Sequence, residues 1–219
     1  MRSKSSLLIA TLLLSVACTT NPWDRAEVAD PDGELTALLE DLEEARQDGD
    51  GVAEIEWEIR RLAVYCPRHV PTKMANALIA YRNTDRSLAL QHLDGIFDIE
   101  PSHPEAAILR SKIAVEEGSI AYARKLLEQQ IKFRPDHAGL HESLAGVLYL
   151  LQEYEPARET IDRAARLGAA EWRVAYHLGL IEEAMGNTPA AVRYYNDCLE
   201  VNPAWQPARS RLIGLEGRR

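Results

Sequence analysis

Two histidines one helical turn apart are the residues of this chain whose spacing could hold a metal ion. His137 and His141 stand at positions i and i+4, which would place them on one face of a helix, and imidazole nitrogen is a common ligand of zinc. A helix only begins at His137, however, and no glutamate follows it directly to act as a base. We therefore expect a capping or surface role for this pair and no metal site.

Cys18 closes a segment whose order of residue types is that of a secretory leader. Arg2 and Lys4 form a basic start, and an apolar run of ten residues follows from 7 to 16. Ten helical residues span about 15 Å, which is too short for the roughly 30 Å hydrocarbon core of a bilayer. The pattern predicts a signal peptide over residues 1–17 rather than a membrane span.

The residues before Cys18 resemble a lipobox, the recognition site of the bacterial lipoprotein signal peptidase. The stretch ends Ser15-Val16-Ala17-Cys18, with Ser15 in the place of the usual leucine. The resemblance implies that Cys18 is acylated, and more than one acyl chain makes anchoring stable because each buried methylene contributes about 0.8 kcal/mol. Thr19, the next residue, favours the outer membrane in this class. We expect a lipid-anchored protein of the bacterial cell envelope, at the outer membrane and facing the periplasm.

The sequence contains none of the common catalytic motifs. We find no P-loop, no glycine-rich dinucleotide fingerprint, no nucleophile elbow and no CxxC pair. The net charge of −9 argues against unspecific binding to nucleic acid, which is itself a polyanion. We expect no enzyme, no cofactor and no nucleic-acid partner.

Acidic residues are concentrated near the start of the mature chain. Residues 19–58 hold fourteen acids and two bases, whereas residues 59–219 are nearly balanced. Residues 18–35, which include Pro22, Pro31 and Gly33, are expected to form an acidic linker after the lipidated cysteine. The acidic segment is either a solvated face that anionic lipid repels or a docking surface for a basic partner, and both readings stay open.

The strongest signal in the sequence is a period of 34 residues. Small residues recur at two registers, as is needed where two antiparallel helices cross closely. Proline recurs at a third register, because it ends the second helix of each pair, and large apolar residues at a fourth fill the space between repeats. The four registers are Ala89, Ala123, Ala157 and Ala191; Ala77, Ser111, Ala145 and Gly179; Pro67, Pro101, Pro135 and Pro203, with Ala169 in the missing place; and Ile59, Leu93, Leu127, Ile161 and Tyr195.

These residues resemble the tetratricopeptide repeat (TPR) family. The resemblance implies an all-α fold, a right-handed superhelical solenoid of antiparallel helix pairs with about five repeats and a capping helix. The first repeat is degenerate, with Glu43 and Ile55 at the small positions, and Glu182 replaces the family's usual tyrosine in the last repeat. The repeats are expected at 36–69, 70–103, 104–137, 138–171 and 172–205 of an array over 36–205, with a capping helix and tail at 206–219.

Cys66 and Cys198 lie nearly four repeats apart. A disulfide needs Cα atoms within about 7 Å, whereas packed helices are already about 8–10 Å apart. We therefore expect both thiols to be free, and we expect Cys198 to be a small apolar core residue.

In the TPR family the first helix of each repeat lines a concave groove that takes a segment of a partner protein. Tyrosine and leucine beside mixed charges suit such a groove, because aromatic anchors carry much of the energy of an interface. Carried over by register, the groove candidates are Met74, Leu78, Tyr81, Arg82, Ile108, Lys112, Glu116, Glu142, Tyr149, Leu150, Tyr176, Leu180 and Glu183.

The sequence therefore predicts a non-catalytic scaffold for protein–protein interaction, with a protein or peptide as partner and a lipid as membrane anchor. Small lipoproteins of this build resemble pilotins and the repeat lipoprotein of outer-membrane protein assembly, which implies an adaptor or assembly factor. The alternatives are a regulator or scaffold of cell-wall hydrolases, and a small-ligand or metal-binding module, which would need a deep apolar pocket. The oligomeric state stays open.

Overall fold

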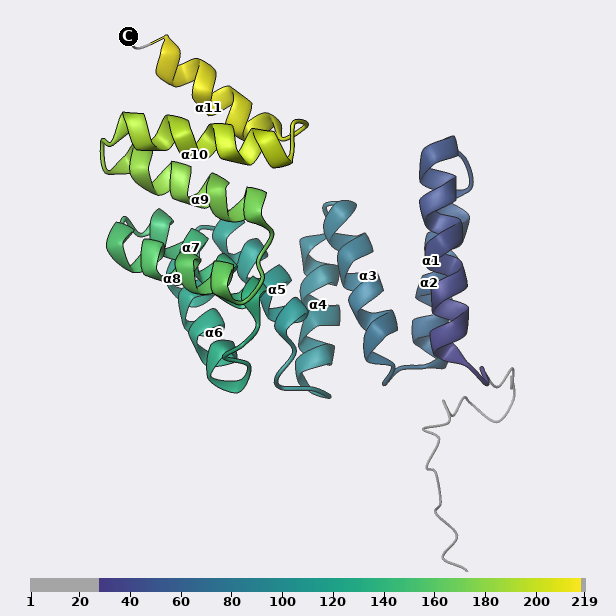
Figure 1. The fold of residues 1–219 in the computed structure, drawn as a ribbon. Helices are drawn as coiled ribbons and strands as arrows, with labels where there is room; N and C mark the ends of the chain where they lie inside the picture. Colours follow the sequence, from purple (N-terminus) through teal and green to yellow (C-terminus); the bar gives the residue numbers. More distant parts are fainter. Residues whose placement is uncertain (1–27, 218–219) are drawn as a thin grey trace, which may run out of the picture. The chain divides into compact units, whose positions relative to one another are not determined.

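The structure, a computed structural model, describes residues 28–217, so the signal peptide and Cys18 lie outside the described residues. Over this range the chain forms eleven helices and no strand (Figure 1). None of these helices is both long and apolar enough to cross a membrane. The helices are α1 (Pro31–Asp48), α2 (Val52–Tyr65), α3 (Val70–Arg82), α4 (Arg86–Phe97), α5 (Pro104–Glu116), α6 (Ile120–Phe133), α7 (Ala138–Leu150), α8 (Tyr154–Arg166), α9 (Glu171–Ala184), α10 (Thr188–Val201) and α11 (Gln206–Glu216).

The described residues divide into two compact bodies, 28–76 and 77–217, and the boundary falls within α3. In the N-terminal body α1 packs against α2. In the C-terminal body each helix from α5 to α10 packs against the next helix, and α5, α7 and α9 also contact one another in turn. Helices therefore pair, and the pairs stack through their first helices, which confirms the all-α repeat fold.

The helix α1 begins earlier than the sequence pattern predicts. The pattern assigns residues 31–35 to the linker, and that assignment is wrong, because α1 starts at Pro31. The Asp30 side chain accepts a hydrogen bond from the Gly33 backbone N–H at 3.0 Å and so caps the helix. Proline suits a first helical position, since its missing N–H has no partner there in any helix.

Histidine side chains cap two of the first helices. His103 Nδ1 accepts a hydrogen bond from the backbone N–H of Ala106 at 3.2 Å, and His137 Nδ1 accepts one from Leu140 at 3.3 Å. His141 Nε2 donates to the carbonyl of Pro135 at 2.9 Å. The capping role expected for His137 is confirmed. Within residues 28–217 no group of three or more histidine, cysteine, aspartate or glutamate side chains is placed to hold a metal.

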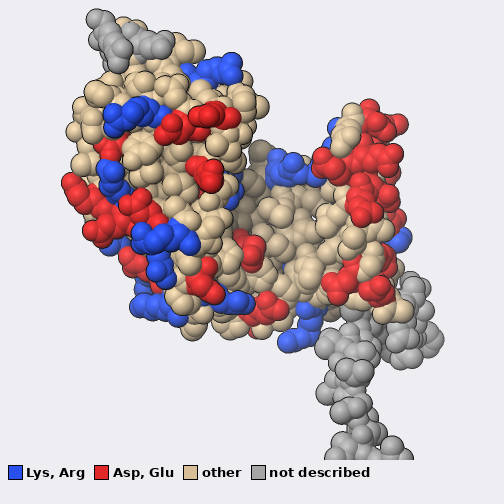
Figure 2. All heavy atoms as spheres, in the orientation of Figure 1, with Lys and Arg blue, Asp and Glu red and all other residues tan. Residues whose placement is uncertain are grey.

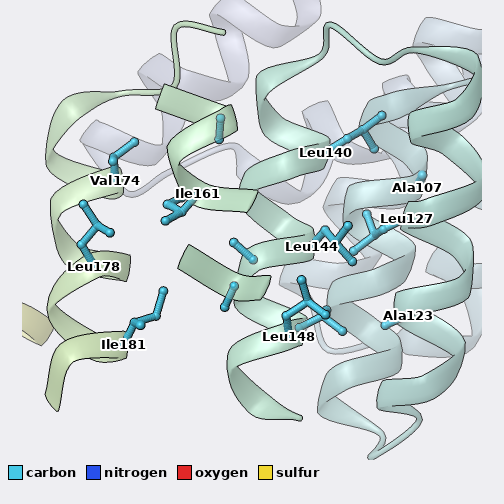
Figure 3. Packing of buried hydrophobic residues seen from close by; sticks show 14 of the residues in the cluster. Ala107, Ala123, Leu127, Leu140, Leu144, Leu148, Ile161, Val174, Leu178 and Ile181 are labelled. Atoms are coloured by element: carbon cyan, nitrogen blue, oxygen red, sulfur yellow. The ribbon is translucent and has the colours of Figure 1, made fainter. Parts of the chain in front are cut away.

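The small and large registers pack as the helix-pair argument requires. Ala123 and Ala157 are fully buried, and so are Leu127 and Ile161 between the repeats. Figure 3 shows Leu140, Leu144 and Leu148 along α7, between neighbours from the adjoining helices. Repeat 1 departs from this scheme, because Glu43 stands at a small register and is exposed.

The last repeat combines the largest core residue with the smallest crossing residue. Tyr195 is fully buried at the register that holds leucine or isoleucine in the other repeats. A Cβ atom added to Gly179 would lie 2.5 Å from Tyr195 Cε1, which is closer than real contacts allow. Glycine at 179 therefore makes room for the tyrosine ring.

Glu182 is a buried carboxylate, with 3% of its surface exposed. Arg158 of α8 forms an ion pair with it, and Asn187 Nδ2 donates to its Oε2 at 2.8 Å. A buried charge is tolerated when it is paired and hydrogen-bonded. Charge pairing between repeats 4 and 5 therefore compensates for the burial of Glu182.

The two described cysteines differ in their chemistry. Cys198 is free and fully buried in the core of the last repeat, as expected. Cys66 is also buried but is disulfide-bonded, so the expectation that its thiol is free is wrong.

The contact between Gly179 and Tyr195 gives a test of this packing. Gly179→Ala should destabilise the protein by about 1–3 kcal/mol, because the added methyl overpacks the crossing. The same substitution in a Tyr195→Leu background should cost less, since leucine is the residue at this register in repeats 2 and 3. Denaturant unfolding of the four proteins measures the coupling. Equal costs of Gly179→Ala in both backgrounds would contradict this account.

Candidate partner-binding groove

A cavity of about 540 Å³ lies along the first helices of three successive repeats. Its walls come from α5, α7 and α9, the helices that stack on one another in the C-terminal body. Most of the lining is apolar, and charged side chains stand among it. The lining residues are Ile108, Ser111, Lys112, Val115, Glu116, Glu142, Ser143, Gly146, Val147, Tyr149, Leu150, His177 and Leu180.

Seven of the groove candidates line this cavity. They are Ile108, Lys112, Glu116, Glu142, Tyr149, Leu150 and Leu180. The register argument missed six further lining residues. They are Ser111, Val115, Ser143, Gly146, Val147 and His177. All six lie within one helical turn of a candidate, so the helix period could have found them.

The candidates on α3 do not line the cavity. Tyr81 donates a hydrogen bond from its hydroxyl to the Glu116 carboxylate, and Lys112 Nζ lies 5.0 Å from the centre of its ring. Arg86 Nη2 approaches the same carboxylate at 3.1 Å. Tyr81 thus helps to hold Lys112 and Glu116 in place.

Three other candidates on α3, Met74, Leu78 and Arg82, do not line the cavity either. Leu78 and Arg82 are exposed on α3. Met74 belongs to the N-terminal body and is half-buried there.

Tyr176 and Glu183 belong to the core of the last repeat and not to the cavity. The Tyr176 ring packs 6.0 Å from Tyr195 and 5.8 Å from Trp205, measured between ring centres. Glu183 Oε2 accepts the Tyr195 hydroxyl at 2.8 Å, and Arg211 Nη1 lies 3.6 Å from Glu183 Oε1. Burial raises the pKa of Tyr176 despite the opposing effect of Arg211. These side chains hold the end of the array together.

Glu142 and His177 form the polar part of the cavity wall. Arg173 Nε lies 3.2 Å from Glu142 Oε1, and His177 Nε2 lies 3.9 Å from the same oxygen. Burial raises the pKa of Glu142, and Arg173 opposes part of this rise. Burial, and secondarily Arg173, lower the pKa of His177 to about 4. At neutral pH the imidazole is therefore uncharged, and Arg173 is the charged partner of Glu142.

Comparison with known proteins bears on the fold. No protein-family model matches the chain, and no curated protein matches it. TTC0263, a thermophilic TPR protein in Thermus thermophilus, matches with a TM-score of 0.69 at 18% identity, over 84% of this chain and 98% of that one. The chain has a TPR fold.

Two MamA structures are also similar to this TPR chain. A crystal structure of MamA protein matches with a TM-score of 0.54 at 18% identity, over 75% of this chain and 90% of that one. MamA 41-end from Desulfovibrio magneticus RS-1 matches with a TM-score of 0.58 at 15% identity, over 78% and 96% of the two chains. At this identity the likeness concerns the fold alone.

The lowered pKa of His177 predicts a loss of stability in acid. The folded state binds this proton at a pH of about 4, whereas an unfolded histidine binds it at about 6.5. Stability is therefore complete above about pH 6.5 and decreases as the pH falls towards 4, by about 3 kcal/mol in total. His177→Asn should remove this part of the pH dependence, as measured by urea unfolding between pH 7 and pH 4.

The matched control is His141→Asn on α7, since His141 does not line the cavity. This variant should keep the acid sensitivity of the wild type. If His177→Asn lost as much stability in acid as the wild type does, burial of the imidazole would not be the cause.

Proposed function

We propose that this TPR chain is a non-catalytic scaffold that holds a segment of a partner protein in the cavity of α5, α7 and α9. The observation that carries the proposal is the apolar lining contributed by the first helices of three successive repeats. Ile108, Val115 and Leu180 offer surface whose burial by a partner contributes about 25 cal/mol per Å². An elongated segment suits a site built from successive helices.

The exposure of the lining favours a protein segment over an enclosed small ligand. Leu150 is 46% exposed, and Lys112 and Glu116 at the wall are exposed as well. Sites for small molecules bury most of their ligand's surface. A partner's apolar side chains would lie against Leu150 and Leu180, with opposite charges facing Lys112 and Glu116.

Glu142 supports a role of the cavity in recognition. A carboxylate whose pKa is raised by burial is less stable ionised in the folded protein than in water. A free-energy cost of this kind is typical of functional sites, which keep polar groups that do not contribute to stability. Arg173 already balances the charge of Glu142, so this carboxylate would select a partner segment with a hydrogen-bond donor at this point.

We further propose that the scaffold works at the cell envelope, anchored through acyl chains on Cys18, as an adaptor or assembly factor for envelope machinery. The lipid occupies the Cys18 sulfur, so this anchored form carries no disulfide at Cys18. The support is the leader-like sequence of residues 1–17 and the lipobox-like stretch that ends at Cys18. Cross-linking within detergent-solubilised envelopes, followed by mass spectrometry, would identify the partner. A cell-wall hydrolase among the cross-linked proteins would favour the regulator role instead.

The groove is tested by an acidic substitution at its exposed leucine. Leu150→Asp should raise the dissociation constant for the identified partner at least tenfold, which equals about 1.4 kcal/mol of binding free energy. The reason is that a carboxylate replaces an apolar contact. Phe133→Asp on α6 is the matched control, since Phe133 is 55% exposed and does not line the cavity. Calorimetric titration of both variants measures the difference, and equal affinities would place the partner elsewhere.

The anchor is tested at Cys18. Cys18→Ser should abolish incorporation of radiolabelled palmitate and should prevent processing at the lipobox, because serine offers no thiol for the lipid. Metabolic labelling followed by immunoprecipitation measures both effects. Absence of label on the wild-type protein would exclude the lipid anchor while leaving the groove proposal untouched.

A further inference from the structure

The outward face of α2 carries exposed apolar side chains. Trp57 is 53% exposed and Val64 is 76% exposed. They are two helical turns apart and so lie on one face, opposite to the buried Ile59. Arg60 and Arg61 stand between them, and the Arg61 guanidinium lies 5.1 Å from the centre of the Trp57 ring. We call Trp57, Arg60, Arg61 and Val64 the α2 stripe.

The other repeats show that the fold does not require apolar residues on this face. Every residue one or more periods after Trp57 or Val64 is polar and exposed. These residues are Gln91, Lys125, Glu159 and Arg193 at the place of Trp57, and Asp98, Lys132, Arg166 and Glu200 at the place of Val64. Exposure of this face is therefore a property of the repeat, whereas its apolar residues are particular to repeat 1. Such residues mark a surface that a partner covers.

The helix α1 offers a surface of opposite charge. It carries seven acids and one base, and Figure 2 shows acidic side chains covering its visible face. Leu39 on this helix is 41% exposed, with Glu40 beside it and Glu43 one turn further along. We call Leu39, Glu40 and Glu43 the α1 stripe.

We propose that the α1 stripe of one copy of this chain docks on the α2 stripe of a second copy. Leu39 would cover Trp57 or Val64, and its neighbouring carboxylates would face Arg60 and Arg61. Arg61 Nη2 lies 2.5 Å from Glu58 within α2, so Arg60 contributes most of the uncompensated charge. The interface is separate from the cavity of α5, α7 and α9 and does not depend on the proposed function.

The geometry favours a helix over an anionic membrane as the occupant. Packed helices are about 8–10 Å apart, and charges are screened within about 8 Å at physiological salt. A docked helix can therefore touch the α2 stripe without approaching the acids of the α1 helix beside it. An extended anionic plane would face those acids as well, and they would repel it.

Sedimentation equilibrium of the full chain in density-matched detergent tests this interface. The apparent mass should rise with concentration from that of one chain towards twice that value, and the association should weaken at high salt. Trp57→Gln combined with Val64→Asp, the residues at these places in repeat 2, should abolish the association. The control, Lys125→Gln with Lys132→Asp, introduces the same residues on α6 and should leave it intact.

Charge reversal separates this proposal from unspecific contact. Arg60→Glu with Arg61→Glu should be monomeric, and so should Glu40→Arg with Glu43→Arg. An equimolar mixture of the two variants should associate again, because each then offers the other a stripe of opposite charge. A monomeric wild type, a mixture that stays monomeric, or an α2 stripe that binds phosphatidylglycerol vesicles instead would overturn the proposal. Circular dichroism melts verify that each variant folds.

Discussion

The close crossing of two helices within each repeat is the constraint on which this structure depends. Ala123 and Ala157 are fully buried at these crossings, so the helices of a pair approach closely enough for Leu127 and Ile161 to fill the space between pairs. Because the pairs then stack through α5, α7 and α9, three first helices face one side together. The cavity proposed to bind a partner is therefore a consequence of small residues such as Ala123 and Ala157, which do not themselves line it.

Where one residue departs from the pattern, a neighbour compensates. Tyr195 is too large for a crossing with alanine, and Gly179 supplies the missing space. Glu182 places a charge in the core, and Arg158 and Asn187 satisfy it. The first adjustment joins the two helices of repeat 5, and the ion pair of Arg158 with Glu182 joins repeat 4 to repeat 5. Repeat stability is the sum of such neighbour terms.

The fold could be predicted from the sequence because the residues that determine it recur with a fixed period. The site could be predicted only in part, because some of its contacts occur once and follow no period. The period gave the helix pairs, and the register placed residues such as Leu150 and Leu180 at the cavity. The polar wall could not be predicted in this way, since His177 and Arg173 acquire their roles only by meeting Glu142 from another helix. Tyr176 stands at a candidate register but does not line this cavity, because its ring packs against Tyr195 and Trp205. The start of α1 depends on a local cap by Asp30. Pro31 and Gly33 in the same stretch favoured a linker instead, so the sequence pattern did not predict this start.

Residues of repeat 1 that depart from the 34-residue pattern can contribute to a surface that contacts another molecule. Glu43 occupies a place that holds Ala77, Ser111, Ala145 and Gly179 in the later repeats, and there it looks like decay of the motif. In the structure Glu43 is exposed, whereas its four counterparts are buried. The helix α1 has 18 residues, against 13 in α3, α5 and α7. An exposed glutamate at this place shows that it is not a close crossing point in repeat 1. The outward face of α2 departs from the period in the same repeat, with Trp57 and Val64 where all later repeats are polar. Departures on both helices of one repeat, one acidic and one basic and aromatic, are what a surface selected for contact would show, because loss of constraint alone gives no reason for apolar residues to appear in water.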